Sequence, residues 1–111
     1  MNILTRRKRQ RATPKKQGWP QHLAWVRGFN CLIAGKHECG GRVEAHHVRE
    51  GHTAGMGQKP PDYWAVPLCS KAHGEGHTIG WQTFETKYGV TLKEAAARLA
   101  STSPHRKRWE A

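Results

Sequence analysis

The sequence has little apolar material and little acid. Of its 111 residues, 36% are hydrophobic and only eight are Asp or Glu. A chain this poor in apolar side chains buries a small core, so we expect a metal or a disulfide to stabilise it. No stretch approaches the roughly 18 apolar residues of a membrane span, and the first residues lack the apolar segment of a secretion signal. We therefore expect one small cytoplasmic domain without a membrane partner.

Cysteine is scarce too, with three in the chain. An odd number, in a chain expected to stay in the reducing cytosol, favours metal ligation over disulfides. Cys31 and Cys39 have seven residues between them, and Cys69 precedes a predicted helix. Because thiolates are preferred zinc ligands, the three predict a structural Zn²⁺ site. The fourth ligand stays open between His73, one helical turn beyond Cys69, His37 beside Cys39, and another residue.

Acid is absent from residues 1–17, which hold seven of the 19 Lys and Arg. We predict a disordered basic arm over 1–17, a folded domain over 18–101 and a frayed basic tail over 102–111. Such arms bind phosphates and release counterions, so DNA, single- or double-stranded, is the expected partner. The residues predicted to bind nucleic acid are Arg6, Arg7, Lys8, Arg9, Arg11, Lys15, Lys16, Arg49 and Lys59.

Local patterns predict a small α+β fold stapled by zinc. Residues 19–27 fit a short helix with proline in its first turn, and residues 42–48 a strand. A helix is expected to start near Ser70, and the capping box over 91–94 predicts a second helix over 92–100. The Gly- and Pro-rich stretch 49–62 predicts a long functional loop. The side chains of Trp81, Phe84 and Tyr88 are interpreted as packing residues, and those of His22, His52 and His105 as surface residues.

Histidines gather between Val43 and His77, a window of 35 residues that holds five of the eight. His46 and His47 are adjacent on a predicted strand, so they should point to opposite faces unless the strand is distorted at its end. His73 and His77 are four residues apart and should share one helix face. One strand histidine can then bind a metal while the other acts as a base. His77, and His73 if it does not bind the zinc, can complete the metal site from the helix. That arrangement suits hydrolysis of phosphodiester bonds.

The order of motifs resembles a known family. The hairpin cysteines are followed by A-H-H-V-R, G-M-G-Q-K-P-P-D over 55–62, V-P-L-C, H-x-x-x-H and F-E-T-K-Y-G over 84–89. Over residues 19–99 this is similar to HNH endonucleases of the ββα-metal fold, and more narrowly to phage recombination-enhancement (Ref-type) and related small phage HNH nucleases. The resemblance implies a ββα-metal core flanked by an N-terminal and a C-terminal helix.

The resemblance also implies a role for each site residue. His47 would be the general base, with His46 the metal ligand beside it. Asp62 falls near the middle position of the motif, which orients the base or fixes the loop. His73 would be the helix metal ligand, supplemented by His77. The chain departs from the pattern at Ala72, where relatives carry a cysteine or histidine, which puts in doubt the fourth zinc ligand or the catalytic set.

We therefore expect a metal-dependent DNA endonuclease with little sequence specificity. Its cofactors would be the structural Zn²⁺ and a catalytic Mg²⁺, Mn²⁺ or Zn²⁺. A phage or prophage origin, in recombination or DNA processing within the host cytoplasm, would make a recombinase or another phage DNA-processing protein a further partner. The alternatives are a non-catalytic zinc module that binds nucleic acid, which the departure at Ala72 favours, and a protein-interaction adaptor.

Overall fold

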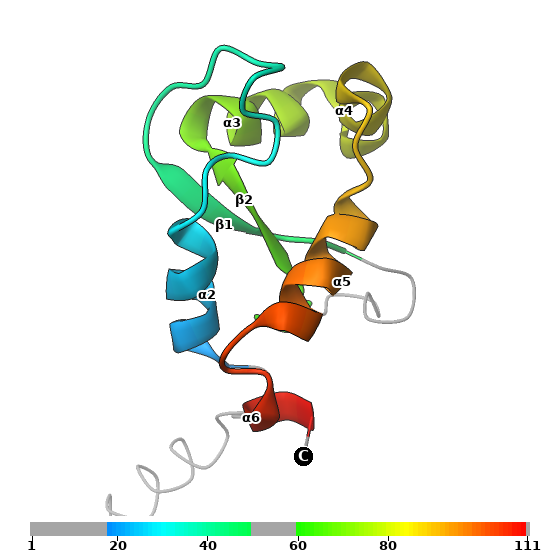
Figure 1. The fold of residues 1–111 in the computed structure, drawn as a ribbon. Coiled ribbons are helices and arrows are strands. Elements are labelled where there is room, and N and C mark those ends of the chain that lie inside the picture. The colour runs from blue at the N-terminus through cyan, green and yellow to red at the C-terminus, as the bar shows by residue number, and fades with distance from the viewer. Residues whose placement is uncertain (1–17, 50–59, 111) are drawn as a thin grey trace, which may run out of the picture.

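The computed structural model describes residues 18–49 and 60–110, and these residues form a small α+β fold, as predicted. A two-stranded sheet and several helices follow one another along the chain (Figure 1). The elements are α2 (Pro20–Arg27), β1 (Val43–His47), β2 (Ala65–Cys69), α3 (Ser70–Ile79), α4 (Trp81–Tyr88), α5 (Leu92–Thr102) and α6 (Lys107–Glu110).

The two strands form an antiparallel hairpin in the middle of the fold. Val43 pairs with Cys69 at one end and His47 with Ala65 at the other. Helix α2 packs on both strands, α5 packs on β2, and α3 contacts both strands and α4 (Figure 1). The β2 strand is buried along its whole length, whereas β1 is half-buried. The hairpin is therefore held from several sides, with β1 on the more open side.

The starts of the predicted helices are as expected, but their caps differ in one case. Helix α3 begins at Ser70, directly after Cys69, whose Sγ accepts a hydrogen bond from the Ala72 N–H at 3.3 Å. Helix α5 begins at Leu92, but Thr91 makes no capping side-chain bond. The Leu92 N–H donates instead to Glu85 Oε2 at 2.7 Å. The cap of α5 thus comes from α4 and ties the two helices together.

Helix α4 has no counterpart in the sequence-based prediction. It begins at Trp81 without a side-chain cap, directly after Gly80, which has a positive φ of 92° and separates α4 from α3. It ends at Tyr88, and the next residue, Gly89, has a φ of 66°. Phe84 is its buried residue and joins Ile33, Leu68 and other apolar side chains in the core. Trp81 and Tyr88 pack against this core, so the packing roles predicted for them and for Phe84 are confirmed. The helix is fixed by this burial rather than by local signals.

The end of the chain packs against the start of the described domain. The predictions of a frayed tail and of a surface position for His22 are both wrong. His22 and Ser103 are fully buried, and His22 Nδ1 lies 3.0 Å from Ser103 Oγ. Trp109 stacks on Tyr63 at a centroid distance of 5.1 Å and meets Trp19 edge-on at 5.7 Å. These aromatic contacts hold residues 103–110 beside α2.

Within the described ranges, no helix combines the length and the apolar character that crossing a membrane requires.

Candidate metal centre and histidine pocket

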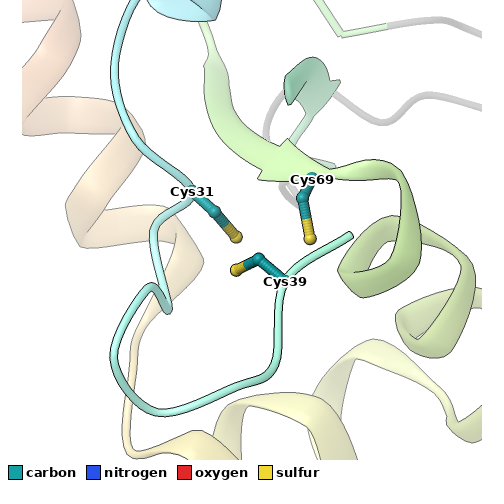
Figure 2. Close-up of side chains that lie close together, drawn as sticks. All are labelled: Cys31, Cys39 and Cys69. Carbon is teal, nitrogen blue, oxygen red and sulfur yellow. The ribbon is translucent and has the colours of Figure 1, made fainter. Parts of the chain in front are cut away.

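Three cysteines from separate parts of the chain meet at one point (Figure 2). Cys31 follows α2, Cys39 precedes β1, and Cys69 ends β2. Their sulfur atoms all lie within 4.8 Å of one another. Thiolates bound to one tetrahedral Zn²⁺ at about 2.3 Å would lie about 3.8 Å apart. The cluster can therefore hold a metal ion such as zinc, in agreement with the ligands predicted from the sequence.

The surroundings of Cys69 favour its thiolate. Burial by itself would raise the pKa of this thiol, but the backbone N–H groups of Ala72 and Gly40 and the neighbouring thiols outweigh it and lower the pKa. N–H donors directed at sulfur stabilise the negative charge that a metal ligand must carry.

A fourth protein ligand is not found among the described residues, where the three cysteines are the only cluster of three or more donors. His37 Nε2 lies instead 3.2 Å from Glu75 Oε1, and its ring packs against Tyr88. His73 pairs with Glu44 and His46, away from the sulfurs. Ala72 is fully buried in the core next to this cluster.

A group of histidine and glutamate side chains lies between β1 and α3. His46 Nδ1 lies 3.2 Å from His73 Nε2, and His73 Nδ1 lies 2.7 Å from Glu44 Oε1. The ring centroid of His77 is 4.9 Å from that of His73 and 6.2 Å from that of His46. Alternation along β1 puts Glu44 and His46 on one face, and the helical repeat puts His73 and His77 opposite them.

Two of these groups, His46 and Glu44, have a defined charge state. Burial lowers the pKa of His46 to about 3, helped by the neighbouring histidines His73 and His77, so its imidazole is neutral at physiological pH. The hydrogen bond from His73, and a second from Ser70, lower the pKa of Glu44 and keep it a carboxylate. A neutral imidazole beside a carboxylate-bound histidine is a suitable pair of metal donors.

His47 points to the other face of β1, as predicted for adjacent strand residues. Its Nε2 lies 2.8 Å from Asp62 Oδ1, and the second oxygen of Asp62 accepts a hydrogen bond from the Trp19 backbone N–H at 2.9 Å. Asp62 is buried, with 8% of its surface exposed. Two bonds on a buried carboxylate leave it little freedom, so it holds the His47 ring in one orientation.

One pocket of about 630 Å³ brings both faces together at the end of β1. Its walls include four histidines and two basic residues, which are His46, His47, His73, His77, Arg49 and Lys93. The structure thus brings the predicted strand and helix histidines to one cavity, with Asp62 behind His47. The other residues predicted to bind nucleic acid, in 1–17 and at Lys59, lie outside the described residues.

Sequence reasoning missed two side chains of this site. Glu44 precedes His46 by two residues, so strand alternation alone places it on the same face. Trp81 stacks on the His46 ring at a centroid distance of 4.2 Å and an interplanar angle of 28°. No local signal identifies that contact, because it joins α4 to β1.

Comparison with known proteins places the chain in a family. Over 83 residues, or 72% of this chain, it is 36% identical to "Uncharacterized protein YdfU" of Escherichia coli (strain K12). The chain spans only 22% of the length of that relative. No solved structure matches the chain. The family described as "Protein of unknown function (DUF968)" matches residues 8–103, and the chain therefore belongs to the DUF968 family.

Proposed function

We propose that this chain is a metal-dependent DNA endonuclease of the ββα-metal type. The observation that carries the proposal is the presence, at one pocket, of a His46–His73 pair 3.2 Å apart and of His47 held by Asp62. The element order supports it, since β1, β2 and α3 form a hairpin followed by a helix, with histidines at the end of β1 and on α3.

The His46–His73 pair fits a divalent cation. Two imidazole nitrogens on one tetrahedral Zn²⁺ would lie about 3.3 Å apart, close to the spacing observed here. Glu44 accepts the Nδ1–H of His73, which leaves the Nε2 lone pair facing His46. The ring of His77 lies 4.9 Å from that of His73, and its nitrogen would join the ion only after a side-chain rotation, because the three histidines do not form a three-donor cluster as they stand. A Mg²⁺, Mn²⁺ or Zn²⁺ ion bound there would neutralise phosphate charge and stabilise the leaving oxygen.

His47 fits the role of general base. The carboxylate of Asp62 can only accept, so Nε2 of His47 carries the proton that it donates. The lone pair of Nδ1 is then available to take a proton from the attacking water. The Trp19 backbone N–H donates to the other oxygen of Asp62 and fixes this carboxylate, which in turn stabilises the Nε2–H tautomer of His47.

The substrate class follows from charge. Arg49 and Lys93 border the pocket, and residues 1–17 add seven basic side chains and no acid. Such contacts bind phosphates of single- or double-stranded DNA and carry no base information, so cleavage would have little sequence specificity. The resemblance to small phage nucleases extends the proposal to recombination or DNA processing.

The test is cleavage of plasmid and single-stranded DNA by the zinc-loaded protein with added Mg²⁺, Mn²⁺ or Zn²⁺. Replacing His47 by Ala should slow cleavage by at least about 100-fold, the usual contribution of a general base. His105→Ala, which changes a half-buried histidine within the C-terminal segment 103–110, is the matched control and should cut at the wild-type rate. Absence of cleavage with every metal, or an H47A variant as fast as wild type, would refute the proposal.

A non-catalytic zinc module that binds nucleic acid is the second candidate. It is favoured by the absence, within the described part of the chain, of any three-donor cluster besides the cysteines. This candidate predicts one tightly bound metal per chain and DNA binding without cleavage. An Ala72→Cys variant separates the non-catalytic module from a nuclease whose zinc site is weakened. The added thiol should restore cutting in such a nuclease and should leave the non-catalytic module without activity.

A further inference from the structure

Trp81 lies against the metal-binding histidines although it belongs to another helix. It is the first residue of α4, after the turn at Gly80. Its indole stacks on His46 at 4.2 Å and meets His77 edge-on at 5.3 Å. On the core side it contacts Phe84 at 5.1 Å. The indole is therefore fixed between the core and the histidine pocket.

The space for this indole is provided by Gly76. Gly76 is buried in α3, between the turns that carry His73 and His77, and a Cβ there would overlap Cζ3 and Cη2 of Trp81. Any larger residue would force the indole to move. Glycine weakens a helix interior, so its use at a buried position indicates that close approach is required. Gly74 is different, since a Cβ on it would meet nothing within 4 Å.

We propose that Trp81, admitted by Gly76, is a positioning residue that fixes the plane of the His46 ring so that Nδ1 faces Nε2 of His73. The imidazole can rotate about two side-chain bonds, and a stacked indole restricts it to one plane. Stacking alone does not choose between the two flipped orientations of the ring. The 3.2 Å contact with His73 makes that choice.

This inference rests on the proposed function only for its consequence, which is metal affinity. The positioning itself can be measured without metal at the histidines. An indole stacked on an imidazole shifts the imidazole proton resonances upfield. In the zinc-loaded full chain, the His46 ring protons should show this shift in wild type and in Gly74→Ala. They should lose it in Trp81→Leu and change in Gly76→Ala, while Trp81→Phe keeps part of it.

Metal affinity is the second readout, measured by Ni²⁺ titration of the zinc-loaded protein with His46→Ala to identify the site. Residues that orient a ligand typically contribute 10- to 100-fold to affinity. We expect Gly76→Ala and Trp81→Leu to bind Ni²⁺ at least about tenfold more weakly, with Trp81→Phe recovering most of the loss. Gly74→Ala should bind as wild type does.

The outcomes separate this inference from the proposed function. Equal Ni²⁺ affinity in wild type and Gly76→Ala, or unshifted His46 resonances in wild type, would overturn the positioning role and leave the endonuclease proposal standing. Absence of Ni²⁺ binding that depends on His46 in wild type would overturn the metal site of the endonuclease proposal, and the ring-proton shifts would still decide the positioning role. A loss in Gly76→Ala with circular dichroism and zinc content unchanged supports positioning, because general unfolding would alter all three.

Discussion

Acidification from pH 7 to pH 5 should destabilise the protein by about 2 kcal/mol through His22 alone. Burial lowers the pKa of His22 from 6.5 to about 4, with a further contribution from the charge of His105 and an opposing one from Asp62. The ring is fully buried, and its Nε2 has no hydrogen-bond partner among the described residues. A second proton would therefore place an N–H where no acceptor is available.

The sign and size follow from proton linkage. The folded state binds this proton less readily than the unfolded chain, so the stabilisation is complete above about pH 6.5 and is lost as pH falls toward 4. The lowering of the His22 pKa from 6.5 to about 4 corresponds to about 3 kcal/mol in total, of which about 2 kcal/mol is lost by pH 5. For a small domain with a total stability of roughly 5–15 kcal/mol, this is a large fraction.

The assay compares urea unfolding of wild type and His22→Gln at both pH values, with zinc present throughout. The introduced amide does not titrate and can still hydrogen-bond to Ser103, whose Oγ lies 3.0 Å from the His22 ring. Titrating groups that do not interact with His22, such as His46, contribute to both proteins and cancel in the difference. The wild type should lose about 2 kcal/mol more than the variant. An equal pH dependence in both proteins would show that His22 is not buried as a neutral ring.

Three further predictions concern metals and DNA. Stripping zinc, or replacing Cys69 by Ser, should abolish cooperative thermal unfolding by circular dichroism, because structural zinc contributes about 10–16 kcal/mol; an unchanged melt after complete zinc release would contradict this. Glu44→Gln removes the carboxylate partner of His73 and should weaken Ni²⁺ binding about tenfold in the zinc-loaded protein. Glu94→Gln, on the exposed face of α5, should not weaken it, and an equal loss of affinity in both variants would contradict the role of Glu44. Deleting residues 1–17, with seven basic side chains, should lower the slope of log affinity for DNA against log salt by up to about 6, and an unchanged slope would rule the arm out as a phosphate contact.

Elements with local signals could be predicted from the sequence. Proline at the first turn of α2, the start of α3 after Cys69 and the helical pattern of α5 each lie within one short segment. Helix α4 could not be predicted in this way, since it has no side-chain cap and is fixed by the burial of Phe84. That burial depends on core residues from the other elements of the chain, so no local pattern shows it.

The same distinction applies to the candidate site. The period of two along β1 predicts that His46 and His47 face opposite ways, and both contacts agree with it. The identity of their partners depends on distant segments, as in the bond from Trp19 to Asp62, 43 residues apart. The burial of His22 cannot be predicted from local sequence for a related reason. Its burial needs Ser103 and Trp109, which come from the end of the chain.

The two candidate metal sites are joined by helix α3, and the geometry of the histidine site depends on the cysteine site more than the reverse. Cys69 ends β2 and caps α3, and His73 follows one helical turn later. An ion at the cysteines therefore fixes the start of α3 and, through it, the distance from His73 to His46 on β1. The reverse does not hold, because His46 and His73 meet through half-buried side chains and do not position the loops that carry Cys31 and Cys39. Changes at the histidines can thus alter the pocket while the cysteine site keeps the scaffold in place.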